Sequence, residues 1–440
     1  MTKWLAIGID QALQITLDTI MPLGNETVQV ISSAGRIAGC DLCAEVDSPS
    51  IDASLKDGYA VKSVDIENAS PDNPVRLSFA GSAAAGDGRE QSLKNGEAIR
   101  ILTGAEIPAG ADAVLAEEFV DWPVISEKKI GCPVVREDNC NSSTTALEGS
   151  TEEIPSFIYA LNCAEPGRNI MPKATDVAKG QVLVSRNQQI SSGYAGLLAA
   201  AGVNNISVFR QPRVSLIATG DEIVAPGQPL PRGKLYASNM VTLASLCKYY
   251  GMQTSLMTAK DSAKAICSAI EKSLGCSDAL ITSGGAWTGD RDLVATVLSD
   301  MGWQQHFHRI RIGPGKAVGF GILEGKPVFI LPGGPPSNLM GFLQIALPGL
   351  LKLAGYSHPG LQRRSVKLAS DLHGRDSGWT QFIFGVLERP KNDVLIQSIF
   401  RPLHQKGRLQ TMAEANAVAA IPEGKTLIKE GSVIQVQLLP

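Results

Sequence analysis

The amino-acid sequence predicts a multidomain α/β protein, in which a parallel α/β domain is flanked by regions rich in β-strands. The chain has 440 residues, and at about 150 residues per domain this length predicts roughly three domains. Between residues 206 and 355, buried strand-like runs alternate with helix-like segments, as is typical of a parallel sheet with helices on both faces. On either side, short strand-like runs are separated by Gly, Pro and Asp, which indicates β domains.

The composition is that of an ordinary folded protein. Hydrophobic residues make up 44% of the chain and charged residues 19%, which argues against disorder over its whole length. The formal net charge of -3 argues against a nucleic-acid binder that relies on a general basic field. Glycine accounts for 44 residues, one in ten, which favours tight turns and close approaches of the backbone.

The sequence also predicts a cytoplasmic protein. The apolar run at the N-terminus ends at Asp10, too early for the core of a signal peptide. No stretch of about 18 uninterrupted apolar residues indicates a membrane span. Cys40 and Cys43 form a C-x2-C pair without a second pair at metal-site spacing, and the five histidines complete no zinc pattern. These thiols are therefore predicted to be structural or incidental, although a metal or redox role is the alternative.

The elements of the first half of the chain follow from periodicity and turn residues. Residues 10–22 have apolar positions at helical spacing and end at a proline, and residues 190–201 are predicted to form a second helix. Between 44 and 165 the runs VRLSFAG, AIRILTG and DAVLAEEFV predict strands. The polar stretch 121–153 is interpreted as a variable insert.

The second half predicts three strand–loop–helix units and then a β domain. Strands at PRVSLIATG, DALITSGG and KPVFILPGG are followed by helices at 239–250, 292–301 and 336–353. Residues 356–440 return to alternating strands, such as WTQFIFGVLE and VIQVQLL, and suggest a small β barrel or sandwich.

Three glycine-containing loops follow these strands, and in an open parallel sheet the ligand binds at that edge. They begin at Thr219-Gly220, at Ser283-Gly284-Gly285 and at Pro332-Gly333-Gly334, and the third continues to Ser337. Glycine lets backbone N–H groups approach an anion, and a helix N-terminus adds its dipole. One such loop is usually only a turn, but three on successive strands predict a phosphorylated ligand.

Charged residues near these loops suggest a metal ion and a phosphate contact. Asp221, Glu222, Asp290 and Asp292 would suit Mg²⁺, which prefers oxygen ligands. The alternative is that Asp221 or Asp292 caps the helix that follows it. Lys316 lies in a rigid Gly-Pro-Gly loop and suits a phosphate, although a solvated lysine fits the sequence equally well.

No nucleophile–base motif is present in the sequence, which lacks both G-x-S-x-G and H-E-x-x-H. His306 and His308 alternate along a strand-like run, so we expect them to share one face and to be structural or solvent-facing. The residues alone therefore predict a nucleotide-like or phosphate-bearing ligand, held with Mg²⁺ by an α/β domain.

The order of motifs resembles the molybdopterin molybdenumtransferase family, which comprises the MoeA proteins and the C-terminal domain of gephyrin. The likeness extends over nearly the whole chain. It rests on DGYAV at 57–61, GEAIRILTGA at 96–105, GRNI at 167–170 with Asp176, TGDE at 219–222, Ser238-Asn239, SGG at 283–285 with Gly289 and Asp292, PGK at 314–316, LPG at 331–333, and Ala415-Asn416 with IPEG at 421–424.

The resemblance implies a four-part subunit that forms a homodimer. The α/β domain at 206–355 would be a MogA-like three-layer domain that binds molybdopterin. It would be flanked by an inserted β-rich domain at 44–165 and a C-terminal β barrel at 356–440. Residues 1–43 and 166–205 would form a split N-terminal helical and linker domain. The site would lie between one subunit's α/β domain and the partner's β domain.

The resemblance also implies a reaction and residue roles. Molybdate would be inserted into adenylylated molybdopterin with release of AMP, assisted by Mg²⁺, and other cofactor-biosynthesis proteins are conceivable partners. The implied catalytic residues are Asp57, Thr103, Asp176 and Glu222, and the implied metal ligands are Asp221, Glu222 and Asp292. The implied ligand-binding residues are Thr219, Gly220, Ser238, Asn239, Ser283, Gly284, Gly285, Gly289, Pro314, Gly315, Lys316, Pro332, Gly333, Gly334 and Ser337.

The sequence departs from the family pattern at several cationic or polar positions. Met171 begins a stretch where the family has an arginine-rich turn with glycine, Gly313 stands where lysine is common, and Gly334 replaces asparagine. Loss of an arginine removes a bidentate anion clamp. Two alternatives therefore stay open: a non-catalytic relative that binds molybdopterin or a partner protein, and a diverged nucleotide pyrophosphatase.

Overall fold

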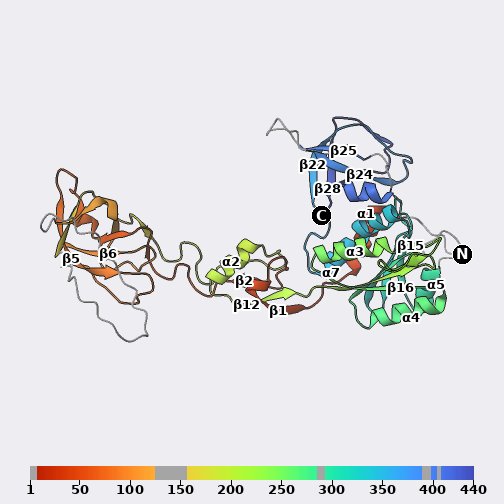
Figure 1. The fold of residues 1–440 in the computed structure, drawn as a ribbon, viewed down its shortest axis with the longest axis horizontal. Helices are drawn as coiled ribbons and strands as arrows, with labels where there is room; N and C mark the ends of the chain where they lie inside the picture. The colour runs from red at the N-terminus through yellow and green to blue at the C-terminus, as the bar shows by residue number, and fades with distance from the viewer. Residues whose placement is uncertain (1–6, 124–155, 285–292, 389–397, 404–407) are drawn as a thin grey trace. The chain divides into compact units, whose positions relative to one another are not determined.

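The computed structural model describes residues 7–123, 156–284, 293–388, 398–403 and 408–440 (Figure 1). The chain divides into two compact units. The first comprises Met1–Leu42, Val184–Ala195 and Asn205–Pro440, and the second comprises Cys43–Leu183 and Gly196–Asn204. The predicted four-domain boundaries stay a prediction. Most of the predicted insert at 121–153 lies outside the described residues, as do Gly285, Gly289, Asp290 and Asp292.

The centre of the first unit is a six-stranded sheet in the order β16-β13-β17-β21-β20-β18. The first four strands are parallel and the last two are antiparallel additions. The strands are β16 (Gln253–Ala259), β13 (Arg213–Thr219), β17 (Ala279–Ser283), β21 (Lys326–Leu331), β20 (Gly319–Leu323) and β18 (Gln304–His308). The three strands predicted from buried apolar runs are β13, β17 and β21, which lie next to one another.

Helices cover both faces of this sheet, which confirms the predicted three-layer α/β class. Alternate residues of each strand enter opposite cores: Leu216 and Phe329 pack on one face, and Ile217 and Leu280 on the other. In Figure 1, α4 (Ala263–Leu274) and α5 (Leu293–Asp300) lie on the opposite side of the sheet from α3 (Ser238–Tyr249). The last helical segment consists of α6 (Pro335–Gly341), a π-helical turn (Phe342–Ala346) and α7 (Leu347–Leu353), and α7 packs on α1 (Ile9–Thr19).

The C-terminal region is a closed five-stranded barrel. The sequence predicted either a barrel or a sandwich for this region. Its strands run β24-β25-β22-β28-β26, and β26 pairs back onto β24. The strands are β22 (Arg363–Leu368), β24 (Thr380–Glu388), β25 (Ile399–Pro402), β26 (Ala417–Ile421) and β28 (Val433–Leu438), with helix α8 (Arg408–Glu414) between β25 and β26. The short strand β19 (Ile312–Gly313) leaves the α/β domain and pairs with β24. The two domains are therefore joined by backbone hydrogen bonding.

The second unit contains a six-stranded sheet in the order β7-β4-β6-β5-β9-β8. The three predicted strands of this region correspond to β5 (Val75–Ala83), β6 (Glu97–Ile101) and β7 (Ala113–Ala116). The other strands are β4 (Gly58–Val61), β8 (Val120–Asp121) and β9 (Phe157–Ala160). The predicted helix at 190–201 is α2 (Ser192–Ala200). Within the described residues, no helix combines the length and apolarity that crossing a membrane requires.

The two histidines of β18 do not share one environment, contrary to the prediction. The pairing of β18 with β20 shifts register between Gln305 and Phe307, which is a β-bulge at His306. His306 is exposed and stacks on the Phe320 ring, whereas His308 is buried. The bulge inserts one residue and so interrupts the regular alternation on which the prediction depended.

Candidate ligand-binding site

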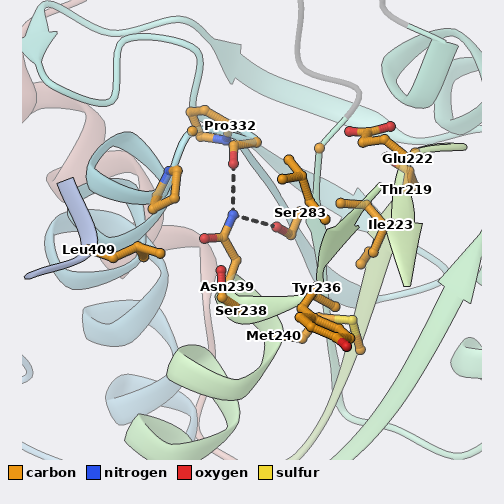
Figure 2. Close-up of a pocket in the computed structure, with 18 of the residues that line it drawn as sticks. Thr219, Glu222, Ile223, Tyr236, Ser238, Asn239, Met240, Ser283, Pro332 and Leu409 are labelled. Atoms are coloured by element: carbon orange, nitrogen blue, oxygen red, sulfur yellow. Dashed lines mark hydrogen bonds between the residues drawn. The ribbon is translucent and has the colours of Figure 1, made fainter. Parts of the chain in front are cut away.

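A large pocket lies where the parallel strands β13, β17 and β21 end. Its volume is about 1470 Å³, and it opens among the three glycine-containing loops (Figure 2). The predicted site residues that line it are Thr219, Gly220, Glu222, Ser238, Asn239, Ser283, Gly284, Pro332, Gly333 and Gly334. The rule that ligands bind beyond the carboxyl ends of parallel strands therefore located this pocket.

Gly284 has a conformation and a packing environment that exclude a side chain. Its φ is +105°, and a Cβ atom there would lie 2.5 Å from the carbonyl oxygen of Thr219. Its N–H donates to the carbonyl oxygen of Leu331 at 3.1 Å. Glycine here lets the loop after β17 approach the end of β13 and hydrogen-bond to β21, so the ends of all three strands meet at the pocket.

Two asparagines hold the loops of the pocket together. Asn239 Nδ2 donates to the carbonyl oxygen of Gly333 at 2.8 Å and contacts Ser283 Oγ at 3.5 Å (Figure 2). Asn338 Nδ2 donates to Ser283 Oγ at 3.0 Å and to the carbonyl oxygen of Pro332 at 2.9 Å. Asn338 was not predicted, because no sequence signal separates it from an ordinary helix residue. These bonds fix the loops before a ligand binds.

Thr219 lines the pocket and has a buried polar atom without a partner among the described residues. Its side chain is 3% exposed, and its Oγ1 has no hydrogen-bond partner among the described residues. A buried hydroxyl without a partner costs free energy, which a hydrogen bond to a ligand would remove.

Carboxylates gather at one side of the pocket. Glu222 and Asp261 line it, and the N–H of Asp261 donates to Asp221 Oδ1 at 3.3 Å. Burial raises the pKa of Asp261 most, a hydrogen bond from the backbone of Asp221 to its carboxylate lowers it, and the charges of Glu222 and Asp221 raise it further. Among the described residues no set of three metal-ligating side chains is close enough to hold an ion, and Asp292 lies outside them. Asp261 was missed because it follows β16, a strand that the sequence did not predict.

Part of the pocket's lining is apolar and includes a residue of the C-terminal domain. Leu230, Leu235 and Tyr236 come from the segment between β13 and α3, and Leu409 comes from α8. Tyr236 Oη donates to the carbonyl oxygen of Gln228 at 3.0 Å, which fixes its ring. An apolar lining together with polar loops suits a ligand that has a ring system as well as anionic groups.

The other predicted ligand-binding residues that the structure describes line a second pocket of about 650 Å³. These are Pro314, Gly315, Lys316 and Ser337, and Pro332 lines both pockets. Arg375 and Trp379, from the C-terminal barrel, complete it and were not predicted. Neither Lys316 nor Arg375 forms an ion pair with a described carboxylate, and Lys316 Nζ lies 5.9 Å from the centroid of the Trp379 ring. Two cations without a carboxylate partner in the described structure are the kind of groups that suit an anion.

The other predicted catalytic residues belong to the second unit. Asp57 precedes β4 and Thr103 follows β6, and both the N–H and the Oγ1 of Thr103 donate to Asp57 Oδ1, at 2.7 and 2.8 Å. These two hydrogen bonds lower the pKa of Asp57, and the charge of Arg100 contributes. Asp176 is exposed, and its N–H donates to the carbonyl oxygen of Ser48 at 2.9 Å.

The fold and the two pockets are typical of a multidomain protein that binds a ligand at the edge of a parallel α/β sheet. Family models cover most of the chain. Residues 7–202 match the MoeA N-terminal region (domain I and II), residues 215–352 match the probable molybdopterin binding domain, and residues 365–439 match the MoeA C-terminal region (domain IV).

Curated relatives and solved structures agree with these matches. The molybdopterin molybdenumtransferase of Nostoc sp. is 30% identical over 426 residues, which cover 94% of this chain and 89% of the relative. The enzyme of the same name from Haemophilus influenzae is 32% identical over 351 residues, with 79% and 78% covered. A crystal structure of the molybdopterin biosynthesis MoeA protein from Pyrococcus horikoshii superposes with a TM-score of 0.79 at 30% identity, covering 99% of both chains. The chain therefore belongs to the MoeA family of molybdopterin molybdenumtransferases, a family of transferase enzymes that takes part in molybdenum cofactor biosynthesis.

Proposed function

We propose that this protein inserts molybdate into adenylylated molybdopterin and releases AMP. The observation that carries the proposal is the pair of pockets that share Pro332. The larger pocket has preorganised glycine-containing loops and an apolar wall, and the smaller one has two unpaired cations among its described residues. The large pocket would hold the adenylylated pterin, and Lys316 and Arg375 would hold the oxyanion.

The described groups of the large pocket suit the phosphate-bearing part of such a substrate. Backbone N–H groups at the start of α3, beside Ser238 and Asn239, face an anion with the favourable end of the helix dipole. We propose Thr219 as a further ligand contact, because it lines the pocket. These groups would orient the phosphoanhydride, which must be cleaved to release AMP.

We propose Mg²⁺ as the cofactor, held by Asp221 and Glu222, with Asp292 as a further ligand implied by the family resemblance. Carboxylate oxygens are the ligands that Mg²⁺ prefers. Asp221 and Glu222 lie close enough to Asp261 for their charges to raise its pKa, and a cation would relieve this repulsion. Bound Mg²⁺ would neutralise charge on the phosphates during cleavage.

We further propose that the protein acts as a cytoplasmic homodimer. In this arrangement Asp57, Thr103 and Asp176 would serve the site of the partner subunit as catalytic groups. The hydrogen bonds from Thr103 favour the ionised form of Asp57. An ionised carboxylate is needed to orient a cationic or proton-donating partner. Light scattering of the purified protein tests the dimer, because a monomer at micromolar concentration would contradict this part of the proposal.

The reaction is tested by incubating the protein with adenylylated molybdopterin, Mg²⁺ and molybdate. AMP should be released in amounts that depend on molybdate, and Lys316→Met should raise the KM for molybdate about tenfold or more, because it removes one of two cations. Binding of the pterin without AMP release would favour the non-catalytic alternative. Hydrolysis of plain dinucleotides without molybdate would favour the pyrophosphatase.

A further inference from the structure

We propose that Gln381 is a positioning residue of the smaller pocket, because it fixes the loop that carries Arg375. This inference rests on the proposed oxyanion role of that pocket. Gln381 contacts neither pocket as a lining residue, and no sequence motif points to it. Its backbone instead pairs with the strand that leads to Lys316, and its side chain bonds the loop that carries Arg375.

The first connection is to the loop of Lys316. Gln381 lies on β24, directly opposite Gly313 of β19, and Pro314 and Gly315 lead from there to Lys316. The same pairing places Thr380 opposite Ile312, and the N–H of Thr380 donates to the carbonyl oxygen of Arg311 at 3.2 Å. The start of β24 is therefore held in register with the segment that leads into the Lys316 loop.

The second connection is to the loop of Arg375. Gln381 Oε1 accepts a hydrogen bond from the N–H of Arg375 at 2.6 Å, and Gln381 Nε2 donates to the carbonyl oxygen of Asp376 at 2.7 Å. The oxygen and the nitrogen of one side-chain amide therefore form hydrogen bonds with two consecutive residues. The loop spans the residues between β23 (Leu372–His373) and β24.

This contact matters because Arg375 is exposed and its guanidinium has no ion-pair partner among the described residues. A mobile arginine loses conformational freedom when it binds an anion, and that loss weakens binding. By ordering the backbone of Arg375 in advance, Gln381 reduces the loss. Lys316 needs less help, because its loop contains Pro314 and its Nζ lies 5.9 Å from the centroid of the Trp379 ring.

Gly374 provides an independent way to disturb the same contact. A Cβ atom there would lie 2.7 Å from Gln381 Nε2. The φ of Gly374 is not positive, so alanine suits the backbone, but its methyl group would displace the Gln381 amide. The neighbouring backbone is close as well, with Thr426 Cα at 3.3 Å. Gly374→Ala should therefore mimic the loss of Gln381 while the glutamine itself is retained.

The experiment measures molybdate binding by calorimetry for the full-length protein and three variants. Gln381→Met keeps the length of the side chain and removes both hydrogen bonds, and Gly374→Ala displaces the amide. Gln435→Met is the matched control, because Gln435 is exposed on the same barrel and, among the described residues, its side chain donates only to Ser365 Oγ, at 2.6 Å. We expect the Kd for molybdate to rise about tenfold in the first two variants and to stay unchanged in the control.

Turnover separates positioning from a general structural effect. The KM for molybdate should rise in Gln381→Met, while the KM for adenylylated molybdopterin and the melting temperature stay close to those of the wild type. Wild-type affinity for molybdate in both Gln381→Met and Gly374→Ala would overturn the inference and leave the proposed function standing. Absence of molybdate binding by the wild type would instead overturn the oxyanion pocket itself.

Discussion

His308 is a buried imidazole on β18, 7% exposed, and its burial ties the stability of the protein to pH. Burial, and next the charge of Arg309, lower its pKa from 6.5 to about 4. Between pH 6.5 and about pH 4, the His308 imidazole is protonated in the unfolded chain but neutral in the folded chain. This contribution to stability is present in full above pH 6.5 and is lost as the pH falls towards 4.

The free energy of unfolding should therefore decrease by up to about 3 kcal/mol across that window, at about 1.4 kcal/mol per unit of pKa. Urea titrations at several pH values measure it. His308→Gln should reduce the pH dependence of the free energy of unfolding. His306→Gln, at an exposed position, should leave that dependence unchanged. An equally steep profile in His308→Gln would assign the effect to other groups.

Ala174 adopts a backbone conformation that costs energy for any residue with a side chain. Its φ is +62°, in the turn where the sequence departs from the family pattern. Left-handed conformation costs about 1 kcal/mol for alanine but little for glycine. Ala174→Gly should raise the free energy of unfolding by about 1 kcal/mol. In contrast, Ala178→Gly, at an ordinary φ, should lower it, and thermal melts of the two variants should shift in opposite directions.

At the level of helices, replacing two glycines by alanine should change the stability of the protein in opposite directions, although helix propensity favours alanine at both positions. Alanine gains about 1 kcal/mol over glycine inside a helix. At Gly349 of α7, however, a Cβ atom would lie 2.8 Å from Phe329 Cζ and 2.9 Å from Ile20 Cδ1, whereas at Gly196 of α2 nothing lies within 4 Å. Overpacking of this kind costs about 1–3 kcal/mol.

Gly349→Ala should consequently destabilise the protein and Gly196→Ala should stabilise it, as measured by chemical denaturation. The comparison separates packing from helix propensity because the substitution is identical. A stabilised Gly349→Ala variant would show that α1 and β21 yield to the added methyl group at little cost.

For the first unit as a whole, a pair of glutamines, one buried and one half-buried, joins the α/β domain to the barrel. Gln344, in the π-helical turn, is 5% exposed in an otherwise apolar segment. Its Nε2 donates to Gln437 Oε1 at 2.6 Å, and Gln437 Nε2 donates back to Gln344 Oε1 at 3.0 Å. Amides that satisfy each other hold two surfaces in one register.

Removal of one partner should be costly and removal of both less so. Gln344→Leu or Gln437→Leu alone should lower the free energy of unfolding by about 1–3 kcal/mol, because the other amide is left unsatisfied. The double variant should recover part of the loss in a double-mutant cycle. Additive losses would mean that the two amides do not act as a pair.

The sequence by itself determined the family, the α/β class and the edge of the sheet where the large pocket lies. Local chemistry is sufficient for this: buried runs such as 213–219 are too apolar for any place but the centre of a sheet, and glycine after such a strand marks the turn. The strand β16 was missed for the converse reason. It lies at the edge of the sheet, is mostly exposed, and carries no apolar alternation.

Only the tertiary structure decided how the predicted residues are grouped. It divides them between two pockets, with Lys316 and Ser337 in one and Thr219, Asn239 and Gly284 in the other. It also brings Arg375 and Leu409 from the barrel to these pockets, and Asn338 to the loop bonds. Each of these residues looks ordinary in its own segment. Its role arises from contacts between elements far apart in the chain, which periodicity and turn chemistry do not encode.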